Sequence, residues 1–158
     1  MPAQSKFILA VAPHTSNWDF FLGIAAMFSL NLKVSFLGKA SIFRWPVKSL
    51  LTAIGGIAVE RSHSHGVVGQ IVDAFQQNEK FILGLAPEGT RSKTREWKTG
   101  FLQIAKQANV PVVPVSFDFV KKEIRFYTAV VISGEINQQL AEFKQIFSGV
   151  CAKNPQAV

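Results

Sequence analysis

A histidine and an aspartate stand five residues apart near the start of the chain, in the segment 14–19 (HTSNWD). On one continuous helix the two would not share a face. With His14 in a loop and Asp19 in the first turn of the next helix, however, the side chains can meet. A carboxylate on one ring nitrogen would fix the imidazole tautomer, and the other nitrogen could take a proton from a substrate hydroxyl, as in a serine triad. The spacing alone favours a plainer interpretation, in which Asp19 stabilises the helix N-terminus and His14 is a loop residue.

Turn-forming residues follow a predicted strand in the segment 86–92 (APEGTRS). Pro87 and Gly89 favour a turn, which would expose backbone N–H groups beside Arg91 and two hydroxyls. Such a turn suits a phosphate group or a developing oxyanion. The alternative is an ordinary tight turn with solvated charges, which is common for any single Pro-Glu-Gly triplet.

Basic side chains surround these two segments. They are Lys39, Arg44, Lys48, Arg61, Lys93, Arg95 and Lys98. The functional interpretation is a grip on an acceptor phosphate and contact with anionic lipid. A solvated face is the better interpretation for Lys93 and Arg95, whereas both interpretations stand for Lys39 and Arg61.

Other site chemistries have little support in the sequence. His63 and His65 have no cysteine partners and no H-E-x-x-H pattern, so no metal site is predicted. The absence of a G-x-S-x-G elbow argues against a protein nucleophile, and neither a Walker A nor a G-x-G-x-x-G loop is present. Cys151 is the only cysteine, so no internal disulfide can form. We therefore predict no metal and no cofactor.

The length of 158 residues predicts one domain over 1–158, with a frayed tail over 152–158. The formal net charge is +7 and the pI is near 9.8, which suits anionic lipid, nucleic acid or an acidic carrier protein as a partner. No apolar run approaches the ~18 residues that a membrane span needs, and the start does not resemble a signal peptide. We expect a cytoplasmic protein, peripherally associated with the inner face of the membrane.

Apolar runs alternate with helical periodicity along the chain. Short apolar runs predict strands at 7–12, 34–37, 57–60, 81–86, 112–119 and 124–132. Helical spacing predicts helices beginning near Asn17, at 65–78, at 101–108 and from Ile136 to Val150, with Pro46 in the first turn of a short helix. This alternation predicts an α/β fold, a single domain with a central, largely parallel or mixed β-sheet flanked by helices.

Four residues of suitable chemistry follow or end predicted strands: His14, Lys39, Arg61 and Glu88. Ligand sites of such sheets lie beyond the carboxyl ends of the strands. If the four strands are parallel neighbours, these side chains meet at one edge of the sheet. That convergence is the best evidence for a site that the residues themselves provide.

Four segments in order match known motifs. They are H-x-S-x-x-D at 14–19, a glycine-containing strand that ends in an acid and an arginine at 55–61, P-E-G-T-R-S at 87–92, and V-P-x-x-P-V at 110–115. On these segments, which span 14–115 and about two-thirds of the chain, the protein resembles the glycerolipid acyltransferase family. The best-known members of that family acylate lysophosphatidic acid.

The resemblance implies a single-displacement acyl transfer to the hydroxyl of a lysophospholipid such as 1-acyl-glycerol-3-phosphate. His14 would be the general base and Asp19 would orient it. The donor would be an acyl thioester, either acyl-CoA or acyl carrier protein, with no metal and no covalent enzyme intermediate. The acceptor and phosphate site would comprise Glu88, Gly89, Thr90 and Arg91, assisted by Lys39 and Arg61. The fourth motif would help to form the acyl-chain region.

Three alternatives remain open at this stage. The first is a lipid-binding, membrane-associated module with weak or no turnover. The second is an acyltransferase for a lipid acceptor that is not a glycerophosphate. The third, a nucleic-acid-binding domain, rests on the pI alone, and because the sequence has no nucleic-acid motif, we predict no nucleic-acid partner. The expected partners are the donor, the lysolipid, an anionic membrane surface and an acyl carrier protein.

Overall fold

A six-stranded sheet organises the chain, of which the computed structural model describes residues 4–59, 66–89 and 96–157. The strands lie in the order β3-β2-β4-β1-β5-β6. Their bounds are β1 Lys6–Val11, β2 Val34–Lys39, β3 Gly56–Val59, β4 Phe81–Leu85, β5 Val112–Asp118 and β6 Glu123–Phe126. All pairings among β1 to β5 are parallel, and only β6 runs antiparallel to its neighbour β5. The predicted α/β fold with a mixed sheet is confirmed.

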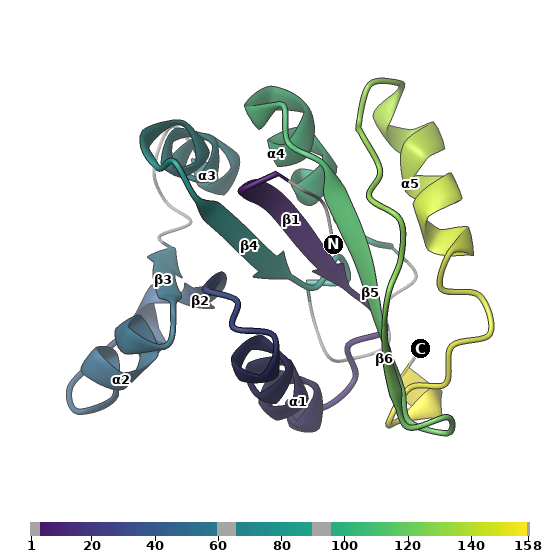
Figure 1. The fold of residues 1–158 in the computed structure, drawn as a ribbon, viewed down its shortest axis with the longest axis horizontal. Coiled ribbons are helices and arrows are strands. Elements are labelled where there is room, and N and C mark those ends of the chain that lie inside the picture. Colours follow the sequence, from purple (N-terminus) through teal and green to yellow (C-terminus); the bar gives the residue numbers. More distant parts are fainter. Residues whose placement is uncertain (1–3, 60–65, 90–95, 158) are drawn as a thin grey trace.

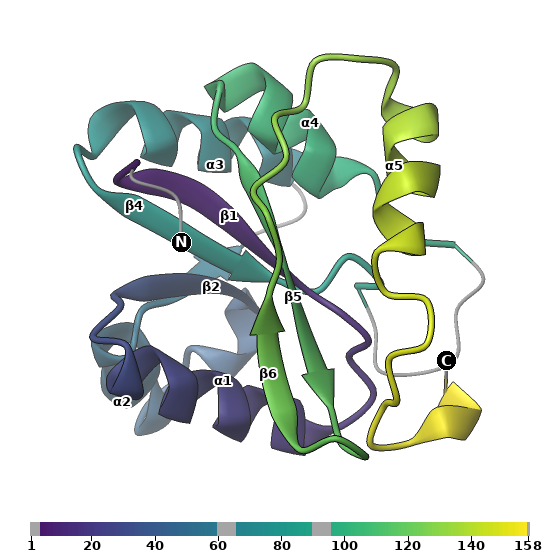
Figure 2. The same ribbon diagram turned by 45° about the vertical axis from the view of Figure 1, so that its right-hand side comes forward.

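Helices cover both faces of this sheet (Figure 1). Their bounds are α1 Asn17–Ser29, α2 Val47–Ala53, α3 Gly66–Gln77, α4 Gly100–Ala108 and α5 Ile136–Gln145. Single 3-10 turns form at Ala40–Ile42 and Pro155–Ala157. In Figures 1 and 2, α3, α4 and α5 lie on one side of the molecule, and α1 and α2 lie on the other.

The central strands are buried on both faces, which explains their unbroken apolar runs. Ile8 of β1 and Leu83 of β4 pack against Phe75 of α3 and Phe143 of α5 in the larger core. Because side chains alternate along a strand, Leu9 points to the other face. There it joins a second cluster that lies under α1.

The strand predicted at 124–132 is wrong beyond Phe126. Val115 pairs with Phe126, and an isolated bridge then pairs Val112 with Val130. The step along β5 is three residues and the step along the other segment is four, so one extra residue interrupts the ladder, as in a β-bulge. The last helix is likewise shorter than predicted, since α5 ends at Gln145.

The tail predicted to fray over 152–158 is held in place over its first residues. Ala152 is buried, and Asn154 forms two hydrogen bonds with Thr15. Within the described residues, none of the helices has the length and apolar character to cross a bilayer.

Candidate active site

His14 and Glu88 follow two adjacent parallel strands, β1 and β4, at their carboxyl ends. The His14 backbone N–H donates a hydrogen bond of 2.9 Å to Glu88 Oε2. The two loops are therefore joined across the edge of the sheet where a ligand site is expected. The convergence predicted from the strand ends is confirmed for this pair.

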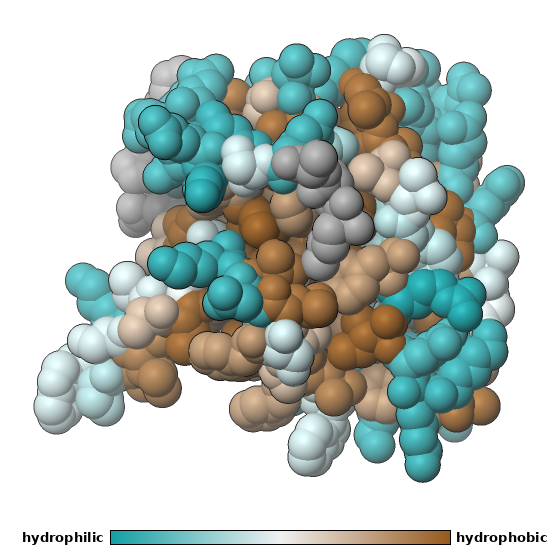
Figure 3. All heavy atoms as spheres, viewed as in Figure 1, coloured by the Kyte–Doolittle hydropathy of each residue, from teal (hydrophilic) through white to brown (hydrophobic). Residues whose placement is uncertain are grey.

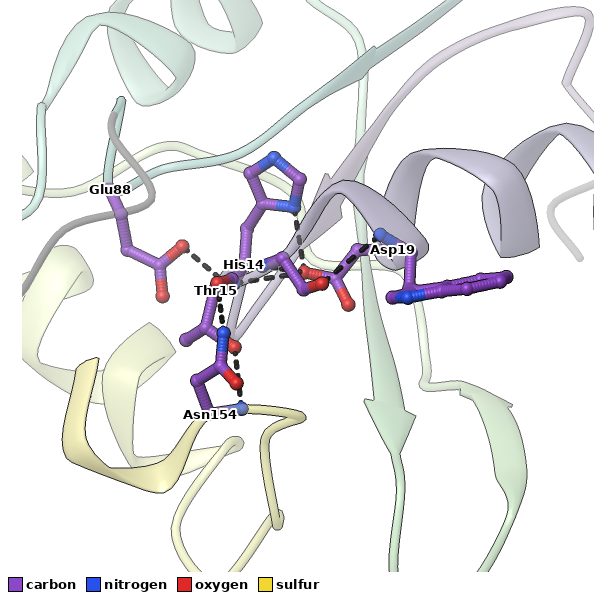
Figure 4. Close-up of polar contacts among 7 residues, drawn as sticks. His14, Thr15, Asp19, Glu88 and Asn154 are labelled. Carbon is purple, nitrogen blue, oxygen red and sulfur yellow. Dashed lines mark hydrogen bonds and ion pairs between the residues drawn. The ribbon is translucent and has the colours of Figure 1, made fainter.

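The imidazole of His14 contacts the carboxylate of Asp19. His14 Nδ1 lies 3.1 Å from Asp19 Oδ2, and the Asp19 residue is 2% exposed. Asp19 comes from the first turn of α1, while His14 precedes the helix (Figure 4). A carboxylate at Nδ1 favours the tautomer that carries the proton on that nitrogen, and in this tautomer Nε2 has the chemistry of a proton acceptor.

Asp19 also starts the helix. Its Oδ2 accepts the backbone N–H groups of Thr15 and Ser16, each at 2.9 Å. Ser16 Oγ in turn accepts the N–H of Trp18 at 3.1 Å, which completes a capping box. The Asp19 carboxylate therefore both stabilises the start of α1 and contacts the His14 imidazole. The position of His14 thus depends on the N-terminus of α1.

Glu88 is a buried acid, 9% exposed. Burial raises the pKa of Glu88 above its ordinary value, the hydrogen bond from the His14 amide lowers the pKa in part, and the nearby Asp19 charge adds a small increase. The family resemblance assigns Glu88 to the acceptor and phosphate site. In the structure its carboxylate accepts the backbone N–H of His14.

Backbone hydrogen bonds fix the turn that follows β4. Gly89 has a φ of +67°, in the left-handed region that favours glycine. Its N–H donates to Ala86 O at 3.1 Å, and the Lys98 N–H donates to Pro87 O at 2.8 Å. The prediction that this turn offers exposed amides to a ligand is therefore wrong for Gly89, because internal hydrogen bonding fixes the turn.

A cavity of about 730 Å³ lies between α1 and the sheet, and His14 and Asp19 belong to its wall. Its other lining residues are mostly apolar, such as Phe20 and Met27 of α1 and Phe117 of β5. Gly84 of β4 also lines the cavity, and a Cβ there would lie 3.0 Å from Val34 Cγ1. Sequence reasoning did not find this cavity.

The fourth motif was expected to form the acyl-chain region. Of its residues, Val115 lines the cavity. Val110 and Val112 instead belong to the core on the opposite face of the sheet. The cavity is thus built mainly by α1 and by strand positions outside that motif.

Four predicted site residues remain, and the structure describes the backbone position of one of them. Lys39 ends β2 at the same edge of the sheet and pairs in register with Val59 of β3. Arg61, Thr90 and Arg91 lie outside the described residues. Among the residues that the structure does describe, no group of three potential metal ligands comes together.

One residue at the site has no local sequence signal. Thr15, which is 6% exposed, accepts the Asn154 backbone N–H at its Oγ1 over 3.1 Å. The Asn154 side-chain amide donates to Thr15 O over 2.9 Å. The end of the chain thus contacts the loop between His14 and Asp19 (Figure 4).

Comparison with known proteins bears on this arrangement. Residues 2–118 match the family model described as Acyltransferase. The chain is 27% identical over 132 residues to the 1-acyl-sn-glycerol-3-phosphate acyltransferase of Escherichia coli (strain K12), an alignment that covers 77% of this chain and 52% of that protein. It is 31% identical over 108 residues to a chloroplastic 1-acyl-sn-glycerol-3-phosphate acyltransferase of Brassica napus, which covers 65% of this chain and 31% of that protein.

A third relative is the probable 1-acyl-sn-glycerol-3-phosphate acyltransferase of Mycoplasma genitalium. It is 26% identical over 178 residues, with 97% of this chain and 64% of that protein covered. The chain spans about half the length of the curated relatives it matches.

Proposed function

Because this chain belongs to the acyltransferase family, we propose that it transfers an acyl chain from a thioester donor to the hydroxyl of a lysophospholipid, with His14 as the general base. The observation that carries the proposal is the contact between His14 Nδ1 and Asp19 Oδ2 in the wall of an apolar cavity. An acid–base pair and a space for a hydrocarbon chain are what this reaction requires.

His14 begins the reaction by accepting the proton of the acceptor hydroxyl at Nε2. Asp19 stabilises the imidazolium that forms, because its carboxylate lies at Nδ1. The hydroxyl oxygen forms a bond to the thioester carbonyl carbon, and the carbon–sulfur bond breaks. The proton held by His14 then passes to the leaving thiolate. Protons and electrons balance without an oxidant or a metal, so we assign no cofactor.

The cavity takes the acyl chain. Its volume of about 730 Å³ is in the range of roughly 300–1,000 Å³ that is usual for small-molecule pockets. Apolar side chains such as Leu9, Met27 and Phe117 line it, so burying a hydrocarbon chain there is favourable. The reacting carbonyl would lie where the apolar wall meets His14.

The acceptor is a 1-acyl-glycerol-3-phosphate, as the names of the relatives suggest. We assign its phosphate to Arg61 and Arg91, together with Glu88, Gly89 and Thr90, on the basis of the motifs that these residues match. Lys39 joins them because it ends β2 at the same edge of the sheet. The donor is acyl-CoA or acyl carrier protein, and the basic chain suits either acidic donor. Since the acceptor is a lipid, the protein would act at a membrane surface.

The proposal is tested by following the release of free thiol from an acyl-CoA in the presence of lysophosphatidic acid. His14→Ala should lower the rate at least about 100-fold, because a positioned general base contributes roughly 10²–10⁴-fold. Gln145→Ala, on the exposed side of α5, is the matched control and should be silent. Full activity in the His14→Ala protein would disprove the mechanism.

The same assay decides between the remaining alternatives. A lysolipid without a phosphate, used in parallel, reports whether the acceptor is a glycerophosphate. A protein that binds acyl chains but never releases free thiol would be a lipid-binding module. The intact contact between His14 and Asp19 argues against that module.

A further inference from the structure

The helix α1 is apolar around most of its circumference. On its inner side, Leu22 and Met27 pack against the second core cluster. On its outer side, Trp18, Phe21 and Phe28 are 60%, 62% and 75% exposed. The only charged residue of the helix is Asp19, which is buried. A helix that is hydrophobic on every side usually has a partner on every side.

The segment around α2 continues this pattern. Trp45, just before the helix, is 92% exposed, and Leu50 within it is 62% exposed. Of the ten large hydrophobic residues that are exposed among the described residues, eight lie between positions 18 and 50. A large exposed apolar area of this kind marks an interaction site. Figure 3 shows hydrophobic residues running from the centre of this face into its lower middle, near where Figure 1 shows α1, with hydrophilic residues at the lower right.

The helices on the opposite side of the sheet provide an internal comparison. They present polar residues to solvent: Asp73 and Gln76 on α3, Lys106 on α4, and Glu142 on α5 are all exposed. Among the described residues, the exposed large hydrophobic side chains are therefore concentrated on the α1 and α2 side.

Charge indicates which partner this side fits. Residues 20–59 contain no aspartate or glutamate, and the exposed Lys33, Arg44 and Lys48 all lie among them. An apolar surface whose own segment carries cations and no acids complements an anionic lipid surface, whose interface also accommodates Trp side chains. A second copy of the chain would bring like charges together, which disfavours self-association through this side.

We propose that the outer side of α1 and α2, defined by Trp18, Phe21, Phe28, Ile42, Trp45 and Leu50, is a membrane-docking surface that lies on an anionic bilayer. This inference extends the proposed function and rests on it for the identity of the substrate lipid. The inner side of α1 lines the cavity. Docking on the outer side would therefore place the bilayer one helix away from the space that takes the acyl chain.

Vesicle sedimentation tests the docking surface directly. The protein should co-sediment with vesicles of equal parts phosphatidylcholine and phosphatidylglycerol, much less with phosphatidylcholine alone, and less as salt rises. Trp45→Glu and Leu50→Glu should each weaken binding at least about tenfold, because each replaces a membrane-buried apolar side chain by a charge. Both positions are exposed, so folding should be retained. Val131→Glu, at a residue that is 65% exposed elsewhere, is the matched control and should bind as the unmodified protein does.

Activity separates this proposal from the proposed function. With a short-chain lysolipid dissolved below its micelle concentration, the Trp45→Glu protein should keep the activity of the unmodified protein, and with vesicle-bound lysolipid it should lose most of it. Vesicle binding without any acyl transfer would disprove the enzyme and leave the surface standing.

Three results would overturn the docking surface itself. The first is that the unmodified protein does not bind anionic vesicles, and the second is that the glutamate variants bind them as well as the unmodified protein does. The third is that light scattering shows a dimer and that Leu50→Glu dissociates it. The last result would assign the surface to a second copy of the chain.

Discussion

Asn154 holds Thr15 by two hydrogen bonds although 139 residues separate them in the sequence. Thr15 lies between His14 and Asp19, and its own N–H donates to Asp19 Oδ2. Asn154 lies beyond residue 118, where the match to the family model ends. The structure therefore gives a residue outside the family match a part in fixing the His14 loop.

Asn154→Ala should loosen that loop without unfolding the protein. The substitution removes the donor to Thr15 O but keeps the backbone N–H that Thr15 Oγ1 accepts. We expect a loss of about 0.5–1.5 kcal/mol in the free energy of unfolding. Because His14 is positioned by this loop, kcat should fall while KM changes little. Chemical denaturation and steady-state kinetics check both quantities, and an unchanged kcat would show that Asn154 matters for stability alone.

Asp19→Asn separates the two roles of Asp19. An asparagine oxygen can still accept the Thr15 and Ser16 amides that Oδ2 accepts now, so α1 should remain capped. The negative charge beside His14 Nδ1 is lost, and kcat should fall about 10²–10⁴-fold, the range expected for an orienting carboxylate.

Some stability should also be lost in the Asp19→Asn protein. Asp19 Oδ1 is buried and has no hydrogen-bond partner among the described residues, so the new NH₂ group lacks one as well. Asp19→Ala, which also removes the cap, should be less stable than Asp19→Asn in thermal unfolding. Equal stability of the two variants would contradict the capping role.

Glu88→Gln should change how stability depends on pH. The folded protein binds the Glu88 proton more tightly than the unfolded chain, since burial raises the pKa of Glu88. Ionisation of Glu88 therefore lowers the free energy of unfolding as the pH rises through the pKa that Glu88 has in the folded protein. Below the pKa that it has in the unfolded chain, the carboxyl is protonated in both states and this loss is absent. The Glu88→Gln protein keeps an acceptor for the His14 N–H and has no such cost. Its stability relative to the unmodified protein should rise with pH, as measured by chemical denaturation across the acidic to neutral range.

Glu88→Ala is the control for this experiment. It leaves the His14 N–H without its acceptor at every pH, and should cost about 1–3 kcal/mol. A difference between Glu88→Gln and the unmodified protein that stays constant with pH would mean that the carboxyl titrates normally.

The parts of the fold that the sequence predicted are those with local causes. Central strands buried on both faces leave continuous apolar runs, and the cap of α1 depends on residues three positions apart, Ser16 and Asp19. The spacing of His14 and Asp19 left two interpretations open, and the structure shows that the two side chains do meet, because a loop and a first helical turn bring them together. His14 and Glu88 required one further rule, that the carboxyl ends of parallel strands share an edge.

The features that the sequence did not predict have causes that lie far apart in the chain. The cavity is lined by residues that α1 and the strands bring together from separate parts of the chain, and none of these residues predicts a space when it is considered alone. The extra residue opposite β5 breaks a ladder without breaking the apolar run that predicted a strand. The residues around Asn154 in the sequence do not predict its contact with Thr15, which lies far away along the chain.

Gly23 gives a test of where the acyl chain lies. It is on α1 and lines the cavity, and a Cβ added there would lie 3.8 Å from Phe117 Cζ, an ordinary contact. Gly23→Ala should therefore fit, and it should raise stability by up to about 1 kcal/mol because alanine favours the helix. Gly23→Leu should share that gain but extend into the cavity and shorten the space for a hydrocarbon chain.

The ratio of kcat/KM for a short-chain to a long-chain acyl-CoA should then rise in the Gly23→Leu protein and stay near the unmodified value in Gly23→Ala. Comparing the two variants removes the effect of helix stability, since both lose the glycine and only one fills space. The chemistry at His14 is unchanged in both, so the short-chain rate should be retained. If Gly23→Leu leaves the ratio unaltered, the acyl chain does not occupy the space between α1 and the sheet.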